Sequence, residues 1–217
     1  MNDYQEIYHR IFETLGRPLN PEDGIPEAEL PVAEQRLGIR IPKALADFYR
    51  LAGKADDYTS VFNRLLPPNE LSMEYGKLMF LVENQEVVVW GTDALAEPTD
   101  DPPCYQATNK EPLAWDCVSE RCSIFILVML HWEAAFAGAM PFASTAIVEG
   151  KRVDFLDANW SFVGEVNGMR AYNKSGAVIC FVKWENDEWR VFAGATDEAG
   201  LNAIASELGV CWETPGG

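Results

Sequence analysis

The chain is poor in the residues from which metal and nucleophilic sites are usually built. Its 217 residues include only 2 histidines, and neither stands at a ligand spacing from a cysteine, which disfavours a zinc site. The five cysteines are odd in number and form no Cys-x-x-Cys pair: Cys104, Cys117, Cys122, Cys180 and Cys211. The chain opens on MNDYQEIYHR, without the basic and apolar segments of a signal peptide. We therefore expect reduced thiols in a cytoplasmic protein.

Positive charge is also scarce. Lys and Arg number 17 against 34 Asp and Glu, so the formal net charge is −17, and the pI is near 4.4. This balance makes nucleic acid and anionic membrane surfaces poor partners and a basic protein a good one, although acidity that serves only solubility is the alternative. The longest apolar run, residues 124–130, is far too short to span a bilayer.

Apolar and aromatic side chains are plentiful. They make up 48% and 12% of the chain, with 7 Trp, which predicts a folded core and excludes general disorder. The length suits one domain over residues 1–217.

The first quarter of the chain has the apolar spacing of three helices. Residues 4–15 carry one apolar stripe before Gly16, and residues 31–38 begin at Pro31 and end at Gly38. A third helix is predicted over residues 42–53, with Leu45, Phe48, Tyr49 and Ala52 buried and with Lys43, Asp47 and Arg50 facing water.

From residue 77 the pattern changes to that of strands. Residues 78–82 and 87–90 predict a hairpin around a polar tip, and a short strand is expected near residues 104–106. Ser119 is expected to cap a buried helix that ends near Gly138, and residues 145–157 and 169–195 to form an antiparallel meander. A last helix is expected to be capped by Thr196 and to end at Gly209. This order indicates an α+β fold, an antiparallel sheet flanked by helices with a strand-rich extension over residues 141–217.

Two adjacent carboxylate pairs are the candidates for catalysis. Asp56-Asp57 and Asp100-Asp101 could provide an acid and a base or hold magnesium, but such pairs in loops are usually solvated turn formers, which is the interpretation we favour. His131, inside an apolar stretch, is expected to be a satisfied, partly buried histidine. Cys117 and Cys122 are expected to be small core residues.

Three ordered stretches resemble the SUKH superfamily, which includes the Smi/Knr regulators of yeast cell-wall synthesis. The first is AEQRLGIRIPKALADFYRLAG, the second is LMFLVENQEVVVWG, and the third is DDPPCY followed by SERCSIFILVMLHWEAAFAG. The third departs from the family pattern in detail, since SERCSIF stands where an aromatic residue usually follows Ser and Glu more closely. The likeness covers residues 28–140.

The resemblance implies a binding module without catalytic residues, cofactor or metal. Bacterial members of the superfamily are immunity proteins that neutralise toxins of nuclease or deaminase type. We therefore expect this chain to bind a basic toxin domain. A regulatory or scaffolding interaction protein is the second hypothesis, and a small-ligand hydrolase is the third.

Partner binding is expected from a concentrated acidic face. Glu83, Asn84 and Gln85 have two interpretations, as the structural tip of a hairpin, which we favour, or as a family motif that touches a ligand. The full set of candidate partner-binding residues is Asp56, Asp57, Glu70, Glu74, Glu83, Asn84, Gln85, Glu97, Asp100 and Asp101.

Overall fold

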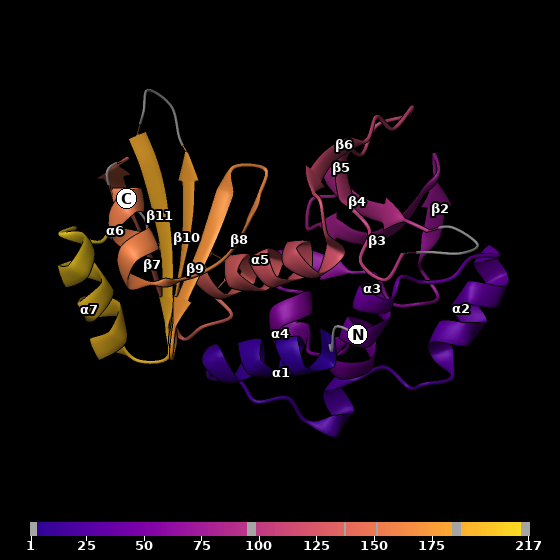
Figure 1. The fold of residues 1–217 in the computed structure, drawn as a ribbon, viewed down its shortest axis with the longest axis horizontal. Helices are drawn as coiled ribbons and strands as arrows, with labels where there is room; N and C mark the ends of the chain where they lie inside the picture. The colour runs from indigo at the N-terminus through magenta and orange to yellow at the C-terminus, as the bar shows by residue number, and fades with distance from the viewer. Residues whose placement is uncertain (1–3, 95–98, 137, 151, 184–187, 214–217) are drawn as a thin grey trace. The chain divides into compact units, whose positions relative to one another are not determined.

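The computed structural model describes residues 4–94, 99–136, 138–150, 152–183 and 188–213. Within these ranges the chain forms seven α-helices and two antiparallel sheets, which confirms the predicted α+β class (Figure 1). It divides into two compact units, residues 1–10 with 19–126 and residues 11–18 with 127–217. The single domain expected over residues 1–217 stays a prediction. None of the described helices is long and apolar enough to cross a membrane.

The N-terminal helices follow the predicted apolar pattern. They are α1 (Tyr4–Thr14), the 3₁₀ helix η1 (Pro21–Asp23), α2 (Glu29–Leu37), α3 (Lys43–Ala52) and α4 (Asp56–Thr59). Helix α2 begins two residues before Pro31 and ends at Gly38, which adopts the left-handed φ of +68° that a glycine tolerates. All four residues of the predicted buried stripe of α3 are at most 3% exposed. The predicted first and last residues of α2 and α3 are thus confirmed to within two residues.

One residue of α3 contradicts its predicted orientation. Asp47 was expected to face water, but it is only 3% exposed. Its carboxylate accepts hydrogen bonds from Lys43, one turn before it, and from Arg50 at 3.0 Å. Burial of a carboxylate is tolerated here because two cations on the same helix compensate its charge.

The first sheet has the strand order β1-β3-β4-β5-β6, with β2 paired to β3. Its strands are β1 (Asn63–Leu65), β2 (Ser72–Glu74), β3 (Lys77–Glu83), β4 (Val88–Asp93), β5 (Cys104–Thr108) and β6 (Asp116–Ser119). The predicted hairpin is confirmed as β3 and β4, and the short strand near residue 104 as β5. The sequence did not predict β1, β2 and β6, because strands of three or four residues show too little alternation.

The predicted cap of the apolar helix is wrong. Ser119 ends β6, and helix α5 spans Cys122–Ala135. The side chain that satisfies its first turn is Asp101, which accepts a hydrogen bond from the Ser123 backbone N–H at 2.7 Å and another from the Ser123 hydroxyl at 2.6 Å. A residue 22 positions upstream therefore caps this helix.

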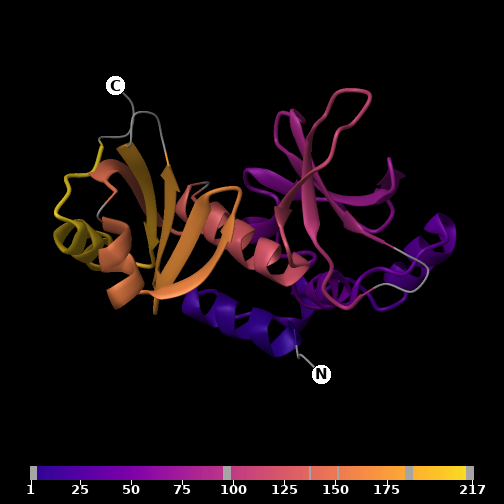
Figure 2. The same ribbon diagram turned by 45° about the horizontal axis from the view of Figure 1, so that its top comes forward.

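The second sheet is an antiparallel meander with the order β7-β11-β10-β9-β8. Its elements are β7 (Phe142–Glu149), α6 (Arg152–Asn159), β8 (Ser161–Val166), β9 (Met169–Lys174), β10 (Ala177–Lys183), β11 (Glu188–Ala195) and α7 (Glu198–Leu208). Helices α6 and α7 cover one face of this sheet (Figures 1 and 2). The meander is confirmed. The prediction of strand structure up to residue 157 is wrong, because residues 152–157 belong to α6. The cap of α7 is Asp197, not Thr196; its carboxylate accepts from Gly200 N–H at 2.7 Å.

Residues 127–135 of α5 cover the opposite face of the second sheet. Trp132 contacts Phe192 of β11 edge to face, with ring centroids 5.1 Å apart. His131 is completely buried. It lies 2.6 Å from the Leu127 carbonyl through Nδ1 and 3.0 Å from the Asn173 amide nitrogen through Nε2, an arrangement that fits a neutral imidazole with its proton on Nδ1. The prediction of a hydrogen-bonded histidine is confirmed, although His131 is completely and not partly buried.

The burial of α3 leads to a first testable prediction. Phe48 is 3% exposed and lies edge to face with Tyr8, at a centroid distance of 5.3 Å. We expect Phe48→Ala to lower the free energy of unfolding by about 3–5 kcal/mol in chemical denaturation. Val32→Ala is the control, because Val32 is 64% exposed and should change stability by less than about 0.5 kcal/mol. Equal effects of the two changes would contradict the described core.

His131 makes stability depend on pH in a defined window. Burial lowers its pKa from 6.5 to about 4, although the bond to Leu127 opposes this. At a pH between these two pKa values, His131 is protonated in the unfolded chain and neutral in the folded chain. The free energy of unfolding therefore falls as the pH falls from about 6.5 to about 4. Across this pH range we expect the free energy of unfolding of the wild type to fall by about 3 kcal/mol more than that of His131→Gln. Parallel pH profiles of the two proteins in urea denaturation would contradict this assignment.

Candidate functional site

The face of the first sheet with the most interaction-prone side chains lies on β3, β4 and β5 and on the turns beside them. We call it the aromatic face and define it by Tyr75, Lys77, Asp93, Tyr105 and Trp115. Lys77, Asp93 and Tyr105 project from the same side of three adjacent strands, as the pairs Lys77–Asp93 and Gly91–Tyr105 show. The other side of these strands is buried, with Leu78, Phe80 and Thr92 at most 1% exposed.

Gly91 allows Trp115 to lie across the aromatic face. A Cβ atom at Gly91 would lie 3.2 Å from the Trp115 ring and 3.1 Å from the Lys77 Cβ, so a side chain there would push the indole away. The indole N–H donates to the Glu74 carbonyl at 3.0 Å. Trp115 is therefore held half-buried in one orientation, with part of its surface open to solvent.

Lys77, Asp93 and Tyr105 form a closed charged cluster. The Lys77 ammonium lies 2.6 Å from Asp93 Oδ1 and 3.4 Å from the centre of the Tyr105 ring, and the Tyr105 hydroxyl donates to Asp93 Oδ2 at 3.0 Å. Burial alone would lower the pKa of Lys77, but its contacts with Asp93 and Tyr105 outweigh burial and raise it. Partial burial, followed by the bond to Asp93, raises the pKa of Tyr105. Both groups therefore keep their protons at neutral pH, and the cluster carries no net charge.

Two carboxylates, Glu74 and Glu111, border the aromatic face. Tyr75 is 57% exposed, and its hydroxyl donates to the Glu111 carboxylate. That hydrogen bond raises the pKa of Tyr75, and Glu74 adds to the effect. Glu111 is exposed in the loop that joins β5 to β6, whereas Asp116, the first residue of β6, pairs with Gln106 and faces the other side of the sheet. The combination is a set of fixed aromatic rings with an acidic rim.

The predicted hairpin tip has the structural role that we favoured. The Glu83 carboxylate accepts hydrogen bonds from the backbone N–H groups of Gln85 at 3.1 Å and Val87 at 3.3 Å. Asn84 and Gln85 are exposed, and the Asn84 N–H donates to the Phe62 carbonyl at 3.0 Å. This tip shows no contact with the aromatic face in the described part of the chain.

The remaining predicted acidic residues lie on several elements. Asp56 and Asp57 are the first two residues of α4 and are exposed. Glu70 pairs with Arg64 of β1 at 2.7 Å. Glu74 ends β2 and contacts the aromatic face through Trp115. Glu97 lies outside the described residues. One concentrated acidic face made of this whole set stays a prediction.

Asp100 and Asp101 have separate roles, although they are adjacent. Asp100 is exposed and uses its backbone carbonyl to accept from the Ala44 N–H at 2.9 Å. Asp101 directs its carboxylate to Ser123 at the start of α5. The two side chains thus do not form the acid–base pair that was weighed as an alternative.

Within the described residues, no group of three or more His, Cys, Asp or Glu side chains is placed to hold a metal ion. None of the five cysteines forms a disulfide. Cys122 is buried as predicted, whereas Cys117 is exposed, so its assignment to the core is wrong. Cys117 lies on the edge strand β6, on the side of the sheet that carries Tyr105, which is its partner on β5.

Sequence reasoning missed the aromatic residues of this site. The sequence places Tyr105 in a short strand near residues 104–106, and Trp115 in the third stretch that resembles the SUKH superfamily, without assigning either residue a role in binding. The signal that could have found them is Gly91, since a glycine inside an apolar strand often marks a place where another group approaches closely. The sequence does not say which group approaches.

Comparisons of the chain with protein-family models, with curated proteins and with solved structures gave no match. The resemblance to the SUKH superfamily therefore stays a hypothesis that rests on the three quoted motifs.

The roles of Asp100 and Asp101 can be separated by mutation. We expect Asp101→Ala to lower the free energy of unfolding by about 1–2 kcal/mol, because it removes the cap of α5. Asp100→Ala should change the free energy of unfolding by less than about 0.5 kcal/mol, since the contact to Ala44 is made by the Asp100 backbone carbonyl and is kept. Guanidinium denaturation of both variants measures the difference. A larger loss for Asp100→Ala than for Asp101→Ala would contradict the described cap.

Proposed function

We propose that this chain is a non-catalytic, cytoplasmic protein-binding module that neutralises a cognate bacterial toxin by binding a basic domain of it. The single observation that carries the proposal is the aromatic face with its acidic rim. The resemblance to the SUKH superfamily, in three motifs that occur in the family's order, supports the assignment to immunity proteins.

The residue types of the aromatic face favour protein recognition. Trp and Tyr are enriched among the residues that dominate the energy of protein interfaces, because each offers a large apolar ring together with a polar atom. Here Trp115, Tyr105 and Tyr75 are partly exposed on one face. Each of them also holds a hydrogen bond to a neighbouring group.

The face is ordered before a partner arrives. Trp115 is fixed by the Glu74 carbonyl and by the space above Gly91, and Tyr105 by Asp93. Side chains that are already in their bound orientation lose little conformational entropy on association. A preorganised face of this kind supports tight binding, as neutralisation of a toxin requires.

The charge of the rim selects a basic partner. Glu74 and Glu111 border the aromatic face, and the whole chain has a formal charge of −17. Nuclease and deaminase domains need positive surfaces to hold phosphates, so an acidic rim attracts the same surface that the toxin uses for its substrate. Long-range attraction of this kind increases the association rate, and added salt reduces it.

The test is rescue of cells from the protein that the neighbouring reading frame encodes. We expect co-expression of the wild-type chain to restore growth, and Trp115→Ala and Tyr105→Ala to weaken binding by about tenfold or more. Glu111→Lys should slow association more than dissociation, and the difference should shrink at high salt. Glu188→Lys, at an exposed position on β11 of the second unit, is the matched charge control.

The outcomes separate the hypotheses. If the neighbouring protein is not toxic, but still binds and loses binding with Trp115→Ala, the regulatory or scaffolding function replaces the immunity function. If binding persists in the aromatic variants and shows no dependence on salt, the aromatic face is not the interface. Circular dichroism of each variant establishes that its fold is intact.

A further inference from the structure

A pocket of about 220 Å³ lies in the first unit, between α1, the start of η1 and the last turn of α3. Six residues line it: His9, Leu19, Asn20, Pro21, Arg50 and Leu51. None of them belongs to the aromatic face, so the inference drawn from this pocket is independent of the proposed function.

The elements around the pocket are fixed to one another by contacts outside it. The segment after η1 is bound to α3, because the Ile25 N–H donates to the Tyr49 carbonyl at 3.0 Å. A Cβ atom at Gly24 would lie only 2.0 Å from the Arg50 carbonyl oxygen, so a glycine is needed for this close approach. Helix α1 is bound to α3 through the Tyr8 hydroxyl, which donates to a carbonyl of α3 at 3.1 Å. The pocket is therefore formed before a ligand arrives.

Arg50 offers the pocket a guanidinium with one free edge. Its Nη1 atom donates to Asp47 Oδ1 at 3.0 Å, which fixes the orientation of the group. Within the described residues, the Arg50 side chain makes no other hydrogen bond or ion pair. The Nε–H and one Nη2–H point in the same direction and remain available. Two parallel N–H donors of this kind match the two oxygens of a carboxylate.

Two further side chains add donors to the pocket, and no lining residue is acidic. His9 and Asn20 each carry at least one N–H group, and His9 makes no hydrogen bond or ion pair in the part of the chain that the structure describes. Asp47 is shared by Arg50 and Lys43, so two cations and one carboxylate leave a single positive charge beside the pocket. This balance suits a monoanion, such as a carboxylate, better than a phosphate dianion.

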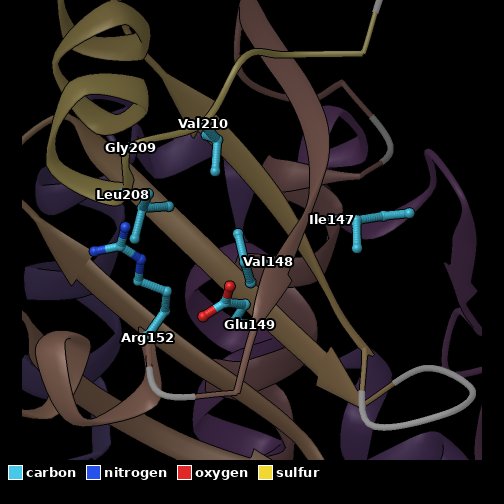
Figure 3. A pocket seen from close by; sticks show the side chains of 7 residues that line it. All are labelled: Ile147, Val148, Glu149, Arg152, Leu208, Gly209 and Val210. Carbon is cyan, nitrogen blue, oxygen red and sulfur yellow. The ribbon is translucent and has the colours of Figure 1, made fainter.

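The apolar wall of the pocket is open to a ligand. Leu19 and Leu51 are half-buried, and Pro21 is exposed. The pocket of the second unit, with a volume of about 210 Å³, differs in this respect, since its Val148 and Leu208 are 7% and 0% exposed (Figure 3). A cavity of about 150 Å³ holds a benzene molecule, so about 220 Å³ leaves room for a ring and a short chain.

From this arrangement we propose that the pocket of the first unit binds a small monocarboxylate that carries an apolar ring. The carboxylate lies on the free edge of Arg50, where His9 and Asn20 donate further hydrogen bonds. The ring packs against Leu19 and Leu51. The free guanidinium edge selects the carboxylate, and the open apolar wall selects the ring.

The experiment is titration of the full chain with 3-phenylpropionate, followed by NMR at constant ionic strength. This ligand should bind saturably with one molecule per chain. 3-Phenylpropionamide lacks the carboxylate and acetate lacks the ring, so each should bind at least about tenfold more weakly. Absence of saturable binding of 3-phenylpropionate up to about 10 mM would overturn the proposal. Equal binding of the amide or acetate would overturn it too, as would tighter binding of phenyl phosphate.

Two variants test the free edge of Arg50. Arg50→Gln should weaken binding of 3-phenylpropionate by about tenfold or more and abolish its preference over the amide. Arg50→Lys keeps a charge beside Asp47 but lacks the planar pair of donors, so it should lose most of the same preference. If Arg50→Gln does not fold, Arg50→Lys decides.

The matched control is Arg152→Gln, which removes the cation from the pocket of the second unit (Figure 3). This variant should bind 3-phenylpropionate as the wild type does. An unchanged preference in the folded Arg50 variants, or an equal loss of binding in Arg152→Gln, would overturn the proposal.

Discussion

The structure depends on how a chain with twice as many acidic as basic residues places its carboxylates. Several of them are acceptors inside the fold and not only solvated surface groups. Asp47 lies between two cations of α3, Asp93 joins Lys77 to Tyr105, and Glu207 accepts from Trp160 and Lys174. These acids fix the orientation of neighbouring side chains, because a carboxylate can accept several hydrogen bonds at once. Acids that remain exposed at the aromatic face, such as Glu111, can then attract a partner.

Much of the fold could be predicted because its signals are local. The apolar spacing of α1 and α3, the glycines that end α2 and α7, and the polar tip between β3 and β4 each depend on a few adjacent residues. The failures share a different cause. In α6, Val153 and Phe155 alternate with polar residues, as is typical of a strand. The segment is nevertheless helical, and Leu156 packs into the core beside the second sheet. No local pattern reports that packing.

The candidate site was less predictable than the fold, since it joins distant segments. Trp115 reaches the carbonyl of a residue 41 positions earlier, and Tyr105 meets a lysine that belongs to another strand. Of the predicted acidic residues, Glu74 borders the aromatic face, while the concentrated acidic face as a whole stays a prediction. The sequence assigned Asp101 to the surface, however, where the structure uses this carboxylate to begin a helix. Composition predicts the sign of a surface, but only the strand register determines which charges share it.

The capping of α5 from the loop before β5 has a consequence for the order of folding. Helix α5 carries a long apolar sequence that would be prone to aggregate if it formed alone, and its first turn has no local acceptor in the place of Asp101. The start of the helix is thus defined only when the loop before β5 has docked, which requires a contact across 22 residues. We therefore expect the first turn of the helix to become stable together with the docking of this loop, and not before it. A nascent chain that has emerged only as far as β6 still lacks the helix against which Phe80 packs.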